Sequence, residues 1–216
     1  MAITDTTPRQ KAKSRTPLMI AAAVVVVMGA MALDTTVVQI GSDLDARKQA
    51  FSPDAYGAAQ FPVIQSSVTG RAVDAAKLAT ELAADKAAAI AAYGVGDGIG
   101  PVIPVRLTGV VANGRSGIYD VTVAGVPDTI RIRVQTGPAI NGTDLRDATG
   151  DIAFGAFTNQ IEYQDAGAGI NRAMSEAILS DVDRDALSGR TLTVTGVFKL
   201  INPKNWLITP VEFDVQ

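Results

Sequence analysis

The residues with the widest choice of chemistry lie together in one polar segment. Residues 137–171 read GPAINGTDLRDATGDIAFGAFTNQIEYQDAGAGIN, in which amides, carboxylates and glycines alternate with apolar side chains. Because each amide offers both donors and an acceptor, amides and a carboxylate beside apolar groups can bind a hydroxylated ligand. The candidate ligand- or partner-binding residues are Arg146, Asp147, Asn159, Gln160, Glu162 and Asn171.

The same polar groups also have a structural interpretation. Side-chain amides and carboxylates cap helices and bond to loop backbone, and buried polar networks are frequently structural. We therefore expect one hydrogen-bonded cluster, in which the polar side chains point toward one another or toward a helix start at Asn171. Its expected members are Asn159, Gln160, Glu162 and Arg146. A structural buttress is favoured for Arg146 and Asp147, whose opposite charges are adjacent. A ligand or partner site is the alternative, and it is favoured for Gln160 and Glu162, which share one face if the segment is extended.

The absence of two residue types limits the kinds of catalytic site that the chain can form. The chain has no histidine and no cysteine, which excludes Ser-His-Asp catalysis, Cys-His catalysis and the usual zinc sites. A pair of carboxylates acting on a glycosidic bond remains. The candidate acids are Asp144, Asp147, Asp151 and Glu162. Nothing in their spacing fixes a geometry, so we predict no catalytic residue, no metal and no cofactor.

The charge balance argues against a nucleic-acid partner. The net charge is -3 and the sequence pI is about 5.0. Part of the positive charge lies in the N-terminal tail, so the rest of the chain is more acidic than the whole. Proteins that bind nucleic acid usually carry a basic face, and the glycine-rich residues 94–100 lack the lysine of a phosphate-binding loop. We expect no nucleic-acid or nucleotide partner.

The N-terminus has the features of a membrane-targeting segment. Residues 1–16 hold four basic residues and one acid, and residues 17–33, PLMIAAAVVVVMGAMAL, are uncharged. A basic flank stays in the cytoplasm, so we expect a single-pass inner-membrane anchor with the C-terminal domain in the periplasm. Ala30-Met31-Ala32 also fits a signal-peptidase site. Cleavage there would release the domain into the soluble periplasm.

The periodicity beyond the anchor predicts helices first and strands later. Residues 71–93 are typical of a helix, and a Gly/Pro-rich boundary follows at 95–104. Residues 169–186 predict a second helix. The expected strands are residues 102–112, 117–126, 129–137, 190–200 and 206–215. Three strands, a helix and two strands match an OB-like five-stranded antiparallel barrel with a helix between strands three and four, hence an α+β fold. A simple antiparallel α+β sandwich is the alternative.

The domain organisation follows from these elements. The predicted parts are a cytoplasmic basic tail at 1–16, a transmembrane anchor or signal peptide at 17–33, a linker and helical segment at 34–100, and an OB-like β domain at 101–216.

Local signals add finer expectations. Asn113-Gly114 suits a tight turn between the first two strands, and Pro53 can begin a short helix. On the helix at 71–93, charged residues recur at three- and four-residue steps and define its exposed face. They are Asp74, Lys77, Glu81 and Asp85.

Several runs resemble those of an uncharacterised bacterial family. They are GPAINGTDLRDA, IAFGAFTNQIEY and GAGIN in the polar segment, FSPDAYGAAQFP before it, and VTGVFKL and PVEFDV after it. On these runs, and on FTNQIEY most specifically, the chain resembles the domain-of-unknown-function family 2291 of predicted periplasmic lipoproteins. The resemblance implies a membrane-tethered periplasmic protein, often encoded beside ribose-type sugar or polyol ABC importers, and it carries over no catalytic residue. A lipoprotein needs a lipobox cysteine, which this chain lacks, so a protein anchor must replace the lipid or the domain is released.

Together these observations predict a non-enzymatic, membrane-tethered periplasmic accessory protein of a sugar or polyol ABC import system. Its expected partners are the inner membrane, an ABC transporter permease or a sugar-binding protein, and a small sugar or polyol. Two alternatives stay open, a carboxylate-based carbohydrate hydrolase and a structural envelope module without ligand.

Overall fold

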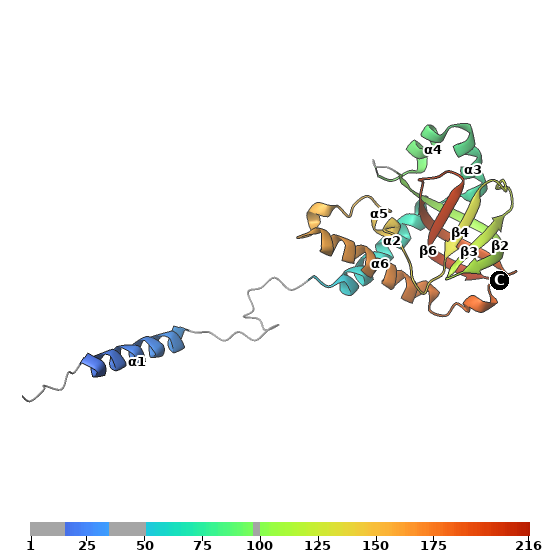
Figure 1. Cartoon of the computed structure of the whole chain (residues 1–216). Coiled ribbons are helices and arrows are strands. Elements are labelled where there is room, and N and C mark those ends of the chain that lie inside the picture. Colours follow the sequence, from blue (N-terminus) through green and yellow to red (C-terminus); the bar gives the residue numbers. More distant parts are fainter. Residues whose placement is uncertain (1–15, 35–50, 97–99) are drawn as a thin grey trace, which may run out of the picture. The chain divides into compact units, whose positions relative to one another are not determined.

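The computed structural model describes residues 16–34, 51–96 and 100–216 of the chain. It divides into two units, Met1–Ala50 and Phe51–Gln216. In the first unit α1, Thr16–Asp34, covers the predicted anchor (Figure 1). Among the residues that the structure describes, no helix meets the length and apolarity needed to cross a membrane. Residues 1–15 of the predicted basic tail and residues 35–50 of the predicted linker lie outside the described ranges.

The second unit is built on one six-stranded sheet. Its strands are β1 Val73–Asp74, β2 Val102–Arg115, β3 Ile118–Val123, β4 Arg131–Gln135, β5 Thr191–Lys199 and β6 Asn205–Val215. β2 pairs with both β3 and β5, β3 with β4, β4 with β6, and β6 with β5. The five strands β2 to β6 therefore form a closed ring of pairings. Its interior is aliphatic, with Trp206 stacked on Phe198 at 4.8 Å between ring centroids.

One pair in the ring corrects the all-antiparallel expectation. β4 and β6 run parallel, with Arg131 opposite Asn205 and Val134 opposite Ile208. Parallel neighbours need a long connection between them. Here the connection is residues 136–204, which contain the helical insertion and β5. The insertion predicted between strands three and four is thus present, and it is what permits the parallel pair.

Helices cover parts of this ring (Figure 1). They are α2 Pro53–Arg71, α3 Ala75–Ala84, α4 Lys86–Tyr93, α5 Asp144–Asp147 and α6 Gln160–Leu179, with 3-10 turns at Phe154–Ala156 and Arg184–Ala186. α2 and α6 pack against each other and against one side of the ring. Their shared core joins Ile64 of α2 and Met174 of α6 to Val197 of β5 and Val211 of β6.

The crossing of α2 and α6 depends on two glycines. A Cβ atom added to Gly57 would overlap the backbone carbonyl oxygen of Gly169, and one added to Gly169 would overlap the carbonyl of Pro53. Both positions are buried. The short helix expected at Pro53 is in fact 19 residues long. It passes through Pro62 and provides the surface on which α6 lies.

The helix predicted at 71–93 is broken into two. Asp74 and Asp85 are exposed as expected, but each is the N-cap of a separate helix and not part of one continuous helix. The Asp74 carboxylate accepts from the backbone N–H groups of Ala76 and Lys77, and Asp85 does the same for the next helix. A carboxylate that satisfies two free N–H groups stabilises a helix start. This is why α3 ends at Ala84 and α4 begins anew.

Two other boundaries were predicted wrongly. The turn between β2 and β3 lies at Ser116 and Gly117, both at positive φ of 54° and 73°, and not at Asn113-Gly114. Gly114 lies in β2, where the ring of Tyr119 occupies the space that a Cβ atom would need. The second helix begins at Gln160, nine residues before the predicted start. Gly167 and Gly169 therefore lie inside the helix, and Gly169 is required by the α2 crossing.

Candidate functional site

α5 places Arg146 and Asp147 in a charged cluster that is largely out of solvent. The Arg146 side chain is 8% exposed, and its Nη2 lies 2.8 Å from Oδ1 of Asp147. Arg146 Nε donates to the same oxygen at 2.9 Å. The other carboxylate oxygen accepts from the Thr143 hydroxyl at 2.9 Å and lies 3.5 Å from Nζ of Lys199. The predicted pairing of Arg146 with Asp147 is therefore confirmed.

The same arginine connects α5 to the start of α6. Its guanidinium carbon lies 3.6 Å from the ring centroid of Tyr163, and Nη1 donates to the backbone carbonyl of Tyr163 at 3.2 Å. Cation–π contact and hydrogen bonding from one planar group hold the arginine in a single orientation. The group is a structural tie between two helices.

Asp144 introduces a second carboxyl beside this pair. Burial raises the pKa of Asp144, the nearby charge of Lys199 opposes that rise, and the negative charge of Asp147 adds to it. A buried carboxyl that holds its proton more tightly has the electrostatics of a general acid.

Asn159 and Glu162 cap α6. The Asn159 side-chain oxygen accepts from the backbone N–H of Glu162 at 2.9 Å, and the Glu162 carboxylate accepts from the N–H of Thr158 at 2.9 Å. This is close to a reciprocal capping box. Gln160 between them is exposed. The structural interpretation thus fits Asn159 and Glu162, and the extended conformation assumed for Gln160 and Glu162 is wrong because both are helical.

The predicted single cluster is therefore two groups. Arg146 and Asp147 form one within α5, and Asn159 and Glu162 form the other at the start of α6. Tyr163 stands between them, because its backbone N–H donates to Asn159 while its carbonyl accepts from Arg146. Asn171 is apart from both. It is 7% exposed, and its amide nitrogen donates to the carbonyl of Gly142 at 2.9 Å.

The acids proposed for glycoside hydrolysis have separate roles. Asp147 is occupied by Arg146, Thr143 and Lys199. The Glu162 carboxylate is bound to the helix start. Asp151 is exposed in the loop before Phe154–Ala156. Asp147, Asp151 and Glu162 therefore lie in three different environments, while the fourth candidate acid, Asp144, lies beside Asp147, whose negative charge helps to raise its pKa.

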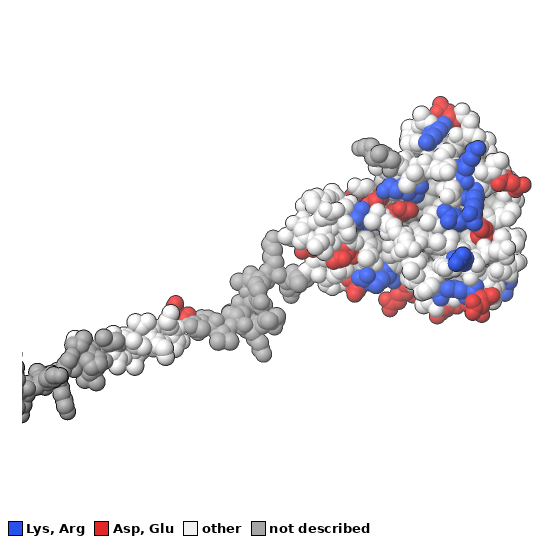
Figure 2. Space-filling view, in the orientation of Figure 1, with Lys and Arg blue, Asp and Glu red and all other residues white. Residues whose placement is uncertain are grey.

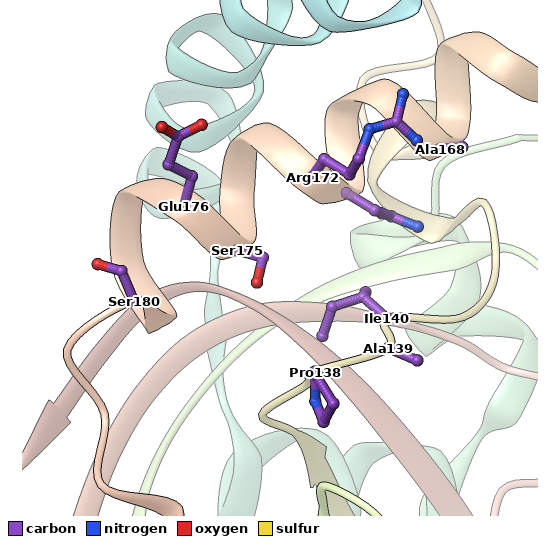
Figure 3. A pocket seen from close by; sticks show the side chains of 9 residues that line it. Pro138, Ala139, Ile140, Ala168, Arg172, Ser175, Glu176 and Ser180 are labelled. Carbon is purple, nitrogen blue, oxygen red and sulfur yellow. The ribbon is translucent and has the colours of Figure 1, made fainter.

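A groove lies along α6, further from its start. It has a volume of about 520 Å³ and separates α6 from residues 138–140 (Figure 3). The lining residues are Pro138, Ala139, Ile140, Ala168, Asn171, Arg172, Ser175, Glu176 and Ser180. The loop side is apolar and the helix side is mainly polar. In Figure 3 the Ser175 hydroxyl points from α6 toward the loop.

The groove walls are held in place by residues outside it. On the helix side Arg172 pairs with Asp54 of α2 at 2.7 Å. On the loop side the buried Gln135 amide donates to the carbonyl of Asn141 and to the Thr209 hydroxyl, and its oxygen accepts from the Asn141 N–H. Both ends of the Gln135 side chain are thus used to fix the loop that forms one wall.

Of the predicted residues only Asn171 lines this groove. The residues missed by sequence reasoning are Arg172, Ser175, Glu176 and Ser180. Arg172, Glu176 and Ser180 are four residues apart and Ser175 is three after Arg172, which places all four on one side of a helix. This spacing is visible in the sequence, but the helix was predicted from the spacing of its apolar residues alone.

Comparison with known proteins identifies the family. The model of the family DUF2291, predicted periplasmic lipoproteins, matches residues 21–214. The chain belongs to the DUF2291 family. The match runs from within α1 to within β6, so the charged cluster and the groove both lie in the DUF2291 region. Comparison with curated proteins gives no match.

A solved structure supports the fold of this DUF2291 protein. The chain is similar to an OB-fold protein from Thermotoga maritima, with a TM-score of 0.62 and 19% sequence identity. The similarity covers 78% of this chain and 100% of that one. At this identity the likeness concerns the fold alone. It agrees with the strand order and with the α+β class predicted from the sequence.

Proposed function

We propose that this DUF2291 protein is a membrane-tethered periplasmic accessory protein of a sugar or polyol ABC import system, acting by binding and not by catalysis. The family description supports a periplasmic location. The basic tail and the apolar residues 17–33 support a tether in the inner membrane with the domain outside. The tether replaces the lipid, because the chain has no cysteine to carry one.

The observation that carries the binding role is the groove along α6. Its apolar wall of Pro138, Ala139 and Ile140 faces a wall that carries hydroxyl, amide and charged groups. A pyranose or polyol presents the same combination of C–H surface and hydroxyl groups. Pockets that bind small molecules are mostly apolar with a few placed polar groups. The groove fits that description better than the charged cluster does.

The charged cluster also favours a binding role over a catalytic one. Arg146 and Asp147 satisfy each other and tie α5 to α6, so they position the loop and helix that border the groove. Asn171 also holds a groove wall in place, because it donates a hydrogen bond to the carbonyl of Gly142 while its side chain lines the groove. These residues shape a rigid surface, and rigid surfaces favour recognition.

Ligand binding by the purified full-length chain in detergent tests the proposal. Isothermal titration with a panel of pentoses, hexoses and polyols should give saturable heat for at least one compound. Ser175→Leu fills the groove and should weaken that binding at least tenfold. Ala177→Leu adds the same side chain at an exposed position of α6 that does not line the groove, so it should bind like the wild type.

Two results would count against the groove. One is the absence of saturable heat across the whole panel. The other is equal binding by the wild type and Ser175→Leu, which would place the ligand elsewhere. Circular dichroism melting of all three chains serves as the folding control.

A further inference from the structure

One end of the domain carries a connected group of aromatic and apolar side chains, here called the aromatic end. It consists of five rings that contact one another, Phe51, Tyr56, Phe154, Phe157 and Tyr163, together with the exposed Ile161 two residues before Tyr163. Ring centroids lie 5.5 Å apart for Phe51 and Tyr56, 5.6 Å for Phe51 and Phe157, and 5.3 Å for Phe157 and Tyr163. Phe154 joins the group through Tyr163 at 5.6 Å. The contacts link the start of α2 to the start of α6.

Part of the aromatic end faces water. Phe154 is 53% exposed and Ile161 is 71% exposed. Ala153, Gly155 and Ala156 beside them are exposed as well. In Figure 2 the part of the domain where α2 and α6 begin is largely free of charged side chains. A contiguous exposed apolar surface on a folded domain usually marks a place of contact.

The position of the aromatic end in the chain indicates what it contacts. Phe51 is the first described residue of the domain and belongs to the aromatic end. The apolar helix α1 ends at Asp34. Residues 35–50 join the two, and a fully extended chain of that length spans at most about 60 Å. If α1 lies in a membrane, the bilayer surface is always within reach of this end of the domain.

We propose that the aromatic end docks on the outer surface of the bilayer that holds α1. This rests on the membrane tether of the proposed function. Phenylalanine, tyrosine and isoleucine suit the interface, where an apolar body enters the lipid and a phenol stays hydrated. A tether keeps the bilayer at high effective concentration, so a small apolar patch is sufficient for docking. A separate protein partner lacks that advantage.

Docking in this way would orient the domain. The starts of α2 and α6 would meet the lipid, while the C-terminus of α6 and the groove beside it would lie further from the membrane. The exposed residues next to the patch include the acids Asp151 and Asp165. Attraction to anionic lipid therefore contributes little, and docking should persist at high salt.

The absence of cysteine makes the test direct. A single Ala156→Cys change gives one site for a nitroxide spin label within the aromatic end, and Ser188→Cys gives a control site. Ser188 lies near the C-terminus, since Arg190 donates to the carbonyl of Gln216. The full-length labelled chain is reconstituted in phosphatidylethanolamine/phosphatidylglycerol vesicles. Oxygen and a water-soluble nickel chelate then report lipid and water exposure by power-saturation EPR.

Docking predicts that the label at Ala156 has a severalfold higher ratio of oxygen to nickel accessibility than the label at Ser188. Phe154→Ser with Ile161→Ser should return the Ala156 label to the water-exposed ratio. Equal ratios at both sites in vesicles that retain the chain would overturn docking while leaving the tether intact. Failure of the chain to float with the vesicles would instead overturn the tether, and with it this proposal. Shielding of the Ala156 label from both reagents would indicate a second copy or a protein partner, and would also overturn it.

Discussion

The guanidinium of Arg146 lies 3.6 Å from the ring centroid of Tyr163 while also forming an ion pair with Asp147 at 2.8 Å. One side chain thereby joins α5 to the first turn of α6. This joint connects residue 146 to residue 163 within the polar segment.

Loss of Arg146 should be strongly destabilising. Arg146→Ala leaves the half-buried Asp147 carboxylate without its closest partner, and breaking a buried pair costs about 3–5 kcal/mol. Urea denaturation of the full-length chain in detergent measures the change. Arg172→Ala is the matched control, because its pair with Asp54 is exposed and should contribute less than about 1 kcal/mol. Similar losses for the two variants would contradict the structural role of Arg146.

The cap of α6 should contribute a smaller amount. Asn159→Ala removes the acceptor for the Glu162 N–H, and loss of an N-cap costs about 0.5–2 kcal/mol. Gln160→Ala, one position along and exposed, should leave the melting temperature almost unchanged. If Asn159 is only a cap, any loss of ligand binding will follow the loss of folded protein. A binding defect at full stability would assign Asn159 to a functional site instead.

The α2–α6 crossing should tolerate no side chain. Gly57→Ala and Gly169→Ala each place a methyl group onto backbone of the facing helix, and overpacking typically costs about 1–3 kcal/mol. Gly70→Ala is the control in α2, since open space surrounds its Cβ position. Alanine is the better helix former there and should raise stability by up to about 1 kcal/mol. Thermal melting compares the three, and a harmless Gly169→Ala would contradict the close crossing.

The strands of this fold could be predicted from the sequence more accurately than the helices. Apolar and polar residues alternate in residues 129–137, and Ile132 and Val134 are buried while Arg131 is exposed. Gln135 continues the polar set but is buried. Its partners Thr209 and Asn141 come from other parts of the chain, so no local pattern could predict that burial.

The errors in predicting the helices have a common cause. The helix boundaries depend on contacts between residues far apart in the sequence, which a short stretch of sequence does not contain. The second helix was predicted to begin at Gly169, yet Gly169 lies inside α6, at the close crossing with α2. The candidate site shows the same limit. The Arg146–Asp147 pair joins neighbours and was predicted, while Lys199, 52 residues further along, completes the cluster only in the folded chain.

Asp144 should make stability fall as pH rises. Burial raises the pKa of this carboxyl above its ordinary value, so between the two values the folded chain holds a proton that the unfolded chain has lost. Stability rises with pH only where the unfolded state binds more protons, and here the folded state does. Asp144→Asn should therefore gain stability relative to the wild type as pH rises above the ordinary pKa of an aspartate, about 3.9.

Asp120 provides a control of opposite sign. A hydrogen bond from Arg131 lowers the pKa of Asp120, so its contribution is present above the unfolded pKa and is lost as pH falls through the folded pKa. Asp120→Asn should be less stable than the wild type near neutrality, and the difference should shrink in acid. Urea titrations at several pH values decide the matter, and the same trend in both variants would contradict the assignment.

The central claim is that this protein serves a sugar or polyol importer at the periplasmic face of the membrane. Its most direct test is affinity purification of the tagged full-length chain from crosslinked membranes, followed by mass spectrometry. The control bait carries residues 1–50 on an unrelated periplasmic domain, so that proteins retained by the tether alone are subtracted. If the protein serves such an importer, an ABC permease or a sugar-binding protein should be enriched with the native chain over the control. Equal recovery of the same proteins with both baits, without a transporter component enriched, would contradict it.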